Sequence, residues 1–160
     1  MARRAQLRIG LISDTHGLMR PEALSFLQGS SHIIHAGDIG ARDILDALGK
    51  IAPVIAVRGN NDTQSWAEDI PMTQSVVLGG VRIFVIHDIK TLRDYPAPPD
   101  TRVIVAGHSH KPLAEERDGV LFVNPGSAGR RRFSLPIAVG ELVISAGAKV
   151  TSHIRELKVS

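Results

Sequence analysis

The sequence predicts an α/β protein in which two mixed β-sheets pack together with helices on the outside. Short runs rich in Ile and Val alternate with helix-like segments in the first two-thirds of the chain. These runs are unbroken rather than alternating in polarity, which is typical of strands that are covered on both faces. After about residue 70, pairs of short apolar runs joined by hairpin turns replace the helix-like segments.

The first part of the chain is expected to form βαβ units. Strands are predicted at residues 7–13, 32–36 and 54–57, and helices at residues 21–28 and 41–50. Pro21 suits the first position of a helix, and Gly29 suits the residue after its end. The second helix carries Ile44, Leu45 and Leu48 on one stripe, as expected for a helix that packs on a sheet.

The later part of the chain is expected to be mostly antiparallel strands. They are predicted at residues 76–78, 82–86, 102–106, 111–117, 120–123, 137–145 and 149–157. The expected hairpin turns are Gly79-Gly80, Asp118-Gly119 and Ala146-Gly147. The Pro-rich residues 95–100 are expected to form a short connection.

Length and composition exclude several classes of protein. A chain of 160 residues fits one domain, which we place at residues 1–160. With no cysteine, thiolate nucleophiles, disulfide scaffolds and Cys-rich metal sites are excluded. The longest apolar run has seven residues, whereas a membrane helix needs about 20. We therefore expect a soluble, cytoplasmic protein with no membrane partner.

Polar residues follow five predicted strands at the point where each strand ends. They are Asp14 and His16, Asp38, Asn60 with Asn61 and Asp62, His87 with Asp88, and His108 with His110. Each group taken alone is also compatible with ordinary turn chemistry. Five such groups at neighbouring strand ends indicate one site, because ligands bind at the carboxyl ends of strands in α/β proteins.

The residue types at these strand ends suit a pair of divalent metal ions. Carboxylate, amide and imidazole donors together bind first-row divalent cations. Six or seven donors are more than one ion needs, and they match two ions that share a bridging carboxylate. Such a pair binds a phosphoryl oxygen and places a bridging hydroxide for in-line attack, as in phosphatases and nucleases.

The ordered series of these motifs resembles that of the calcineurin-like metallophosphoesterases. The string Ile34-His35-Ala36-Gly37-Asp38, and Gly107–His110 followed by Asn124-Pro125-Gly126-Ser127, look like the YfcE-type phosphodiesterase branch. The resemblance covers residues 8–157 and implies a four-layer αββα sandwich with the metals at the sheet edges. It implies a metal-dependent phosphodiesterase that could also accept activated phosphomonoesters. The cofactors implied are two divalent ions, with Mn expected and Ni, Co, Zn, Fe or Mg also compatible.

The resemblance also implies a role for each motif residue. Asp14, His16 and His110 would hold the first metal ion. Asn60, His87 and His108 would complete the second, with Asp38 bridging the two.

The candidate catalytic residues are Asn61 and Asp62, although the chemistry is mainly that of the hydroxide. Larger members of the superfamily have a histidine where this chain has Asn61, and an amide cannot supply a proton at neutral pH. A preference for diesters or activated leaving groups is therefore expected. Asp88 stands where the branch usually has glycine, and it either orients an imidazole or narrows the site.

A phosphate-binding segment is expected after residue 123. Gly126, Ser127 and Arg130 are the candidate substrate-binding residues, because backbone N–H groups in such a turn can face a phosphate. A simple turn built from turn-forming residues explains the same segment equally well. His35 lies inside a predicted strand and could hydrogen-bond near the metal ligands.

Two other functions remain open on the sequence alone. A non-catalytic scaffold of the same fold, like the retromer subunit, would be expected to lose metal ligands. A nucleic-acid partner is not expected, because the net charge is only +3 and 4% of residues are aromatic. The expected partner is a small phosphoester, and a homo-oligomer is compatible with the sequence.

Overall fold

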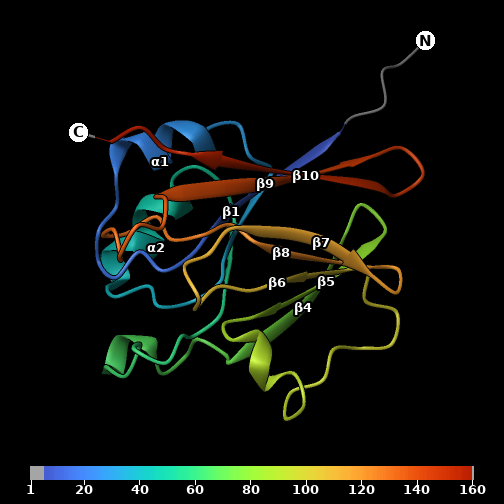
Figure 1. The fold of residues 1–160 in the computed structure, drawn as a ribbon, viewed down its shortest axis with the longest axis horizontal. Coiled ribbons are helices and arrows are strands. Elements are labelled where there is room, and N and C mark those ends of the chain that lie inside the picture. Colours follow the sequence, from blue (N-terminus) through green and yellow to red (C-terminus); the bar gives the residue numbers. More distant parts are fainter. Residues whose placement is uncertain (1–5, 160) are drawn as a thin grey trace.

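Two five-stranded β-sheets lie face to face in the computed structural model, which describes residues 6–159 (Figure 1). The first sheet has the strand order β10-β9-β1-β2-β3. Its strands are β1 (Leu7–Ile12), β2 (His32–His35), β3 (Val54–Ala56), β9 (Ala138–Ser145) and β10 (Lys149–Glu156). β1, β2 and β3 are parallel, whereas β9 and β10 are added antiparallel at the other edge. The carboxyl ends of β1, β2 and β3 therefore share one edge.

The second sheet has the strand order β4-β5-β6-β8-β7. Its strands are β4 (Thr73–Leu78), β5 (Val81–Ile86), β6 (Val103–Val105), β7 (Leu113–Arg117) and β8 (Val120–Asn124). β5, β6 and β8 are parallel, and β4 and β7 flank them antiparallel. The carboxyl ends of β5 and β6 therefore also lie together.

The main core lies between the two sheets. Ile9, Leu11 and Ile34 from the first sheet pack against residues such as Ile83 and Val105 from the second. All five side chains are fully buried. This contact fixes the two sheets against each other, so that their polar strand ends face one another.

Two α-helices cover the outer face of the first sheet (Figure 1). They are α1 (Pro21–Leu27) and α2 (Arg42–Gly49). Leu27 of α1 and Leu48 of α2 are fully buried in one cluster with Ile12 and Ile33. The apolar stripe of α2 therefore packs as the sequence predicts.

The outer face of the second sheet has a different cover. Its apolar residues Phe84, Ile86 and Ile104 pack against Leu92 and Ala97 of the connection that follows β5. That connection contains only a single-turn 3₁₀ helix, η2 (Ile89–Thr91). Within residues 6–159 no α-helix lies on this face, so the outer layer here is thin and leaves part of the sheet open.

The α/β class with two mixed sheets is confirmed. Both predicted helices and all the predicted strands are present, with shifts of a few residues at their ends. The largest difference is β4, which begins at Thr73 rather than at residue 76. Residues 73–75 are polar, yet they pair in register with Phe84, Val85 and Ile86 of β5. A short 3₁₀ helix, η1 (Ser65–Ala67), follows the β3 loop.

A membrane-crossing helix is also absent from the described residues. None of the helices within residues 6–159 combines the length and the apolar character that a membrane span requires.

Candidate metal centre

The polar residues predicted from the strand ends come together where the two sheets meet. Asp14 and His16 follow β1, Asp38 follows β2, and Asn60 lies in the loop after β3. His87 follows β5, and His108 and His110 lie in the loop after β6. The structure groups them into two sets of neighbouring donor atoms.

The first set contains Asp14, His16 and His110, whose candidate ligand atoms all lie within 4.8 Å of one another. Asp14 Oδ1 is 3.9 Å from His16 Nε2 and 3.4 Å from His110 Nε2. The rings of His16 and His110 are stacked, with centroids 5.5 Å apart. One carboxylate and two imidazoles therefore face a common point.

The second set contains Asp38, His87 and His108, with Asn60 beside them. His87 Nε2 is 3.3 Å from Asp38 Oδ2 and also 3.3 Å from His108 Nδ1. Asn60 Oδ1 is 3.1 Å from His108 Nδ1. Two imidazoles, one carboxylate and one amide oxygen thus converge on a second point.

Asp38 lies between the two sets. Its Oδ2 atom is 3.3 Å from His87 Nε2 in the second set and 3.7 Å from His16 Nε2 in the first. Asp14 Oδ1 also approaches the second set, at 4.0 Å from His87 Nε2. The Asp38 carboxylate is therefore placed where a bridging ligand between two ions is needed.

Unpaired buried atoms show that the first set suits a cation. Asp14 Oδ1 and His16 Nε2 are buried and have no hydrogen-bond partner among the described residues. Leaving buried polar atoms unpaired costs about 1–3 kcal/mol each. A divalent ion accepts lone pairs from carboxylate and imidazole, so it satisfies groups of this kind.

The backbone of the site is held in an unusual conformation. Eight non-glycine residues of residues 6–159 have positive φ, and five of them are predicted metal ligands: Asp14, His16, Asp38, His108 and His110. Their φ angles lie between 46° and 70°. Such residues are uncommon and cluster at functional sites, because the surrounding structure must hold them there.

Hydrogen bonds hold the Asp14 carboxylate in one orientation. Its Oδ2 accepts from Ser13 Oγ at 2.6 Å and from the His108 N–H at 3.0 Å, which leaves Oδ1 facing the first set. Gly107 makes this approach feasible, since a Cβ there would lie 2.0 Å from Ser13 Oγ and 2.6 Å from Asp14 Oδ2. The loop after β6 therefore packs directly on the Asp14 side chain.

Asp38 is held in the same way by the loop after β3. Its Oδ1 accepts from the Asn61 N–H at 2.9 Å, and its Oδ2 accepts from Asn61 Nδ2 at 3.1 Å. A Cβ on Gly59 would lie 2.1 Å from the Asp38 nitrogen and 2.2 Å from Oδ1. Only a glycine at position 59 allows the two loops to approach this closely.

The orientation of the His87 ring follows from its contact with the backbone. Its Nδ1 lies 2.7 Å from the Ala36 carbonyl oxygen, so Nδ1 carries a proton and donates it. In the neutral ring, Nε2 then has a free lone pair directed toward the second set. A backbone partner of this kind is typical of metal-binding histidines.

Charges in the metal-free site are strongly coupled. Burial by itself raises the pKa of Asp38, but hydrogen bonds from His87 and the Asn61 N–H bring that pKa down to about 2. Burial alone lowers the pKa of His87, yet its hydrogen bond with Asp38 and the charge on Asp14 raise the pKa overall. Asp38 is therefore ionised at neutral pH and available to a cation.

His35 connects the two loops that carry the first ligands. Burial lowers the pKa of this fully buried side chain to about 4, so the ring is neutral at pH 7. Its Nδ1 accepts from the Gly37 N–H at 3.1 Å, and its Nε2–H donates to Thr15 Oγ1 at 3.0 Å. Thr15 Oγ1 in turn donates to the Ile39 carbonyl at 2.8 Å. His35 thus fixes the Asp14–His16 loop against the Asp38 loop.

The two predicted catalytic residues have positioning roles in the structure. Asn61 donates two hydrogen bonds to Asp38, one from its backbone N–H and one from its side-chain amide, and so holds that carboxylate in place. Asp62 is buried and accepts from the N–H groups of Ile39, Gly40 and Gly59. Both residues join the β3 loop to the Asp38 loop.

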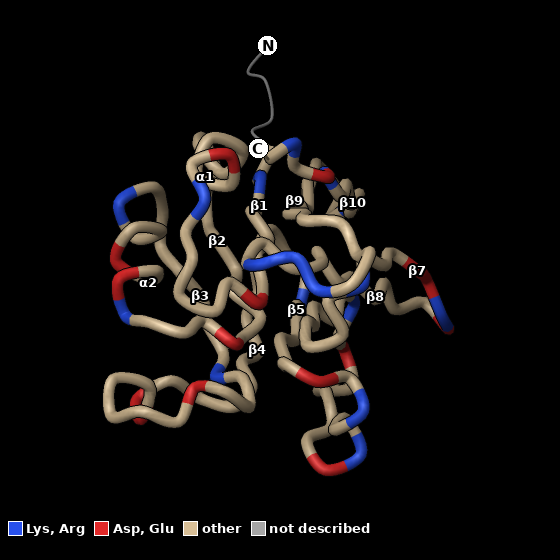
Figure 2. The backbone as a smooth tube through the Cα atoms, turned by 60° about the vertical axis from the view of Figure 1, so that its left-hand side comes forward, with Lys and Arg blue, Asp and Glu red and all other residues tan. Residues whose placement is uncertain are grey.

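The predicted phosphate-binding segment forms a turn that supports Asp14. The Gly126 N–H donates to Asn124 Oδ1 within the turn. Ser127 Oγ donates to the Asp14 carbonyl oxygen, and Ser127 is 3% exposed. The Gly126 N–H and the Ser127 hydroxyl proton are therefore already used within the protein. The second interpretation of this segment, a simple turn, accounts for both hydrogen bonds. Arg130, by contrast, is exposed. It begins the run of three arginines between β8 and β9, where Figure 2 shows a continuous blue segment.

Some residues that support the site were not among the site residues predicted from the sequence. Ser13 precedes Asp14 inside an apolar run, and Thr15 separates two ligands. Asn124 donates to the Gly107 carbonyl oxygen and to Ser109 Oγ, and so supports the loop of His108 and His110. An available signal was that each of these polar residues is next to, or at the end of, a strand that is otherwise apolar.

Curated relatives match most of the chain. A probable metallophosphoesterase of Methanothermobacter thermautotrophicus is 33% identical over 140 residues, which are 80% of this chain and 81% of the relative. Phosphodiesterase YfcE of Escherichia coli K12 is 30% identical over 160 residues, with 85% and 87% of the two chains covered.

Solved structures share the fold at lower identity. Vacuolar protein sorting 29 from Cryptosporidium parvum superposes with a TM-score of 0.76 at 19% identity, covering 96% of this chain and 99% of the other. A structurally characterised archaeal phosphodiesterase gives a TM-score of 0.73 at 24% identity, covering 93% and 100%. The domain described as the calcineurin-like phosphoesterase superfamily domain matches residues 7–146. The chain therefore belongs to the calcineurin-like phosphoesterase superfamily.

Proposed function

We propose that this chain is a phosphodiesterase that works with two divalent metal ions. The observation that supports this most strongly is the position of Asp38 Oδ2, at 3.3 Å from His87 Nε2 and 3.7 Å from His16 Nε2. One carboxylate oxygen thus faces both donor sets. The curated relatives named metallophosphoesterase and phosphodiesterase agree with this activity.

The donor sets define which residues would hold each ion. Asp14, His16 and His110 would hold the first, and Asn60, His87 and His108 the second, with Asp38 shared. Two ions bound there would supply Lewis acidity toward the phosphoryl oxygens and a nucleophile derived from water at neutral pH. Mn²⁺ is the first ion to test, because mixed carboxylate, amide and imidazole donors suit first-row divalent cations.

The charges of the chain favour an anionic substrate. Asp14 and Asp38 supply two negative charges, which is less than the charge of two divalent ions, so the loaded site attracts a phosphoester. Exposed Arg130 adds positive charge near the loop that packs behind Asp14. Gly129, the residue before it, lies against the Asp14 and Thr15 carbonyl oxygens, so the backbone of Arg130 is close to the loop that carries Asp14 and His16.

The chain lacks a proton donor at the position of Asn61. One N–H of its side-chain amide donates to Asp38, and the amide does not titrate near neutral pH. A leaving group that needs no protonation is therefore preferred. This favours diesters and esters of acidic alcohols or phenols over simple alkyl monoesters.

Hydrolysis of bis(4-nitrophenyl) phosphate by stripped and reloaded protein tests the proposal. We expect no hydrolysis after treatment with a chelator and recovery on adding Mn²⁺. Asp38→Asn and His110→Ala should each remove the recovered activity. Asp43→Asn, an exposed carboxylate on α2, is the matched control and should keep it.

Activity that survives both Asp38→Asn and His110→Ala would contradict the proposal. A folded, metal-loaded protein with no activity on any ester would instead support the scaffold alternative. That alternative gives no reason for all seven ligand positions to carry donors that converge, as they do here.

A further inference from the structure

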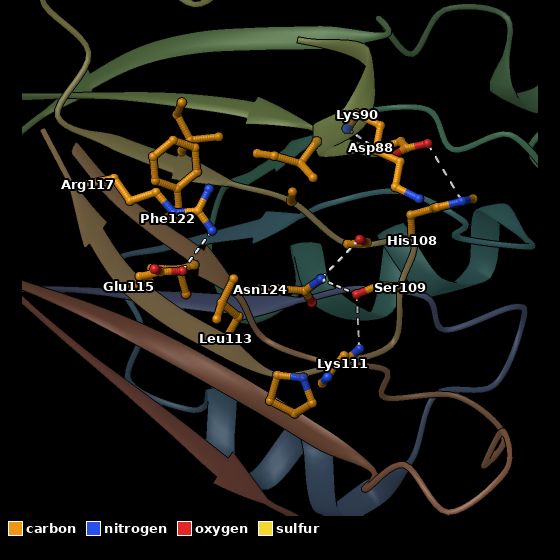
Figure 3. Close-up of a pocket in the computed structure, with 16 residues that line it drawn as sticks. Asp88, Lys90, His108, Ser109, Lys111, Leu113, Glu115, Arg117, Phe122 and Asn124 are labelled. Carbon is orange, nitrogen blue, oxygen red and sulfur yellow. Dashed lines mark hydrogen bonds and ion pairs between the residues drawn. The ribbon is translucent and has the colours of Figure 1, made fainter.

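A groove of about 560 Å³ lies on the open outer face of the second sheet. We call it the outer groove. Its floor is formed by the outer face of the sheet, with Ile104, Ala106 and Phe122 among its lining residues. Lys90 and Lys111 also line it (Figure 3). Ligand pockets for small molecules have volumes of about 300–1,000 Å³, so the outer groove can hold a ring-bearing group.

The outer groove begins at the metal centre. His108, which belongs to the second donor set, lines one end of it together with Asp88 (Figure 3). Asp88 Oδ2 lies 3.7 Å from His108 Nε2, so Asp88 stands beside the ligand, as the sequence suggested. Ile104 is four residues before His108, which limits the distance between their Cα atoms to about 14 Å. A substituent of a phosphoester whose phosphate lies at the metal centre can therefore reach the floor of the outer groove.

The far end of the groove offers flat surfaces. One row across the sheet contains Ile104 of β6, Phe122 of β8 and Glu115 of β7, because these residues are in register on neighbouring strands. The Arg117 guanidinium lies 5.2 Å from the centroid of the Phe122 ring, and it also pairs with Glu115 at 2.7 Å. Aromatic rings and guanidinium planes are the surfaces on which unpaired nucleobases stack.

Polar groups at the side of the groove can meet the edge of a base. Ser109 Oγ accepts from Asn124 Nδ2 at 3.1 Å and from the Lys111 N–H at 3.2 Å, which leaves its own proton free to donate. Within residues 6–159, the amines of Lys90 and Lys111 take part in no ion pair. A groove for an alkyl chain would have no use for these donors.

We propose that the outer groove binds the nucleobase of a nucleotide phosphodiester whose phosphate lies at the metal centre. This rests on the proposed phosphodiesterase activity and assigns its substrate class. A second cavity beside the centre, lined by residues such as Asn60, Met72 and Tyr95, has a volume of only about 130 Å³. That is below the usual size of a ligand pocket, so it suits a small second arm and not a nucleoside.

Binding to the Mn²⁺-loaded protein tests the groove without relying on catalysis. Adenosine 5′-monophosphate and ribose 5-phosphate carry the same phosphate and sugar and differ in the base. We expect calorimetry to give about tenfold tighter binding for the nucleotide, since stacking one base on an aromatic side chain has an effect of this order. Phe122→Leu should remove the difference and Phe122→Tyr should keep it. Val77→Ala, at an exposed position of β4 outside the groove, should not change it.

Kinetics with a shared leaving group separates the groove from the activity itself. The 4-nitrophenyl ester of thymidine 5′-phosphate should have a kcat/KM about tenfold above that of methyl 4-nitrophenyl phosphate, a ratio that Phe122→Leu should lower. Equal kcat/KM values for the two esters in the wild type would overturn the proposal for the groove. A higher kcat/KM for hexyl 4-nitrophenyl phosphate than for the thymidine ester would overturn it as well. If neither ester is hydrolysed, the proposed function fails, while the calorimetric result still decides whether the groove binds a base.

Discussion

Asn61 donates two hydrogen bonds to the carboxylate of Asp38, one from its backbone N–H at 2.9 Å and one from its side chain at 3.1 Å. The residue that stands where larger superfamily members have a histidine is therefore a support for the shared ligand. It fixes the direction of Asp38 Oδ2 toward both donor sets. Residues that orient a metal ligand in this way commonly affect metal affinity about 10–100-fold.

Replacing Asn61 tests this support directly. Asn61→Ala keeps the backbone hydrogen bond and removes the side-chain one, so we expect metal affinity to fall about tenfold. Competition with a chromophoric chelator measures the change. Gln64→Ala, an exposed residue a few positions later, is the control. Unchanged metal affinity in Asn61→Ala would show that the side-chain hydrogen bond does not support the shared ligand.

Because Gly59 lies so close to Asp38, adding a single methyl group at position 59 is expected to disrupt the metal site. Gly59→Ala places Cβ about 2 Å from the Asp38 backbone and carboxylate, so the loops must separate and the metal site must be lost. Gly49→Ala, at the end of α2 with no atom within 4 Å of the new Cβ, is the matched change. Gly49→Ala should leave the free energy of unfolding unchanged or raise it by up to about 1 kcal/mol. Thermal unfolding with and without Mn²⁺ compares the two, and a metal-stabilised Gly59→Ala protein would contradict the geometry.

The neutral His35 predicts an acid-sensitive fold. Its pKa is about 4 in the folded chain and about 6.5 when unfolded. Between these values the unfolded chain binds more protons at this residue, so the contribution of His35 to the free energy of unfolding falls as pH drops from about 6.5 to 4, by about 3 kcal/mol. Urea unfolding of the metal-free protein at several pH values measures this. His35→Gln should flatten that part of the profile, and His153→Gln, at an exposed position, should not.

The raised pKa of His87 predicts that metal binding releases protons. In the metal-free chain His87 is hydrogen-bonded to Asp38 and remains partly protonated above its usual range. A metal ligand must be neutral imidazole, so binding displaces this proton, and apparent metal affinity falls as pH decreases. Calorimetry in two buffers of different ionisation enthalpy counts the protons. Equal heats in both buffers at pH 7 would show that His87 is already neutral.

The strand segments along the chain and the positions of the candidate ligands at their ends could be predicted because they rest on local patterns. Ile- and Val-rich runs marked β1, β2 and β3, and polar residues after them marked the edge of the sheet. The roles of Asn61, Asp62 and Ser127 could not be predicted. Their hydrogen-bond partners lie on loops distant in sequence, and a polar residue in a turn looks the same whether it faces a substrate or the backbone of another loop.

The thin cover of the second sheet was also not visible in the sequence. The Pro-rich connection after η2 was expected, but its packing through Leu92 and Ala97 on only part of the sheet depends on tertiary contacts. The outer groove exists because this connection stops short of β7 and β8. Its residues Phe122 and Arg117 look like ordinary strand residues in the sequence, since alternation shows which face they occupy and not what covers that face.

Metal content measured with the variants of Asp38 and His110 tests the central claim most directly. The wild-type chain, loaded with Mn²⁺ and freed of excess metal, should hold two ions per chain by elemental analysis. His110→Ala should hold one, because it disrupts only the first donor set, and Asp38→Asn should hold fewer than two and show no diesterase activity. Asp43→Asn should match the wild type. One ion per chain in the wild type, or two in Asp38→Asn, would contradict a centre in which Asp38 joins two metals.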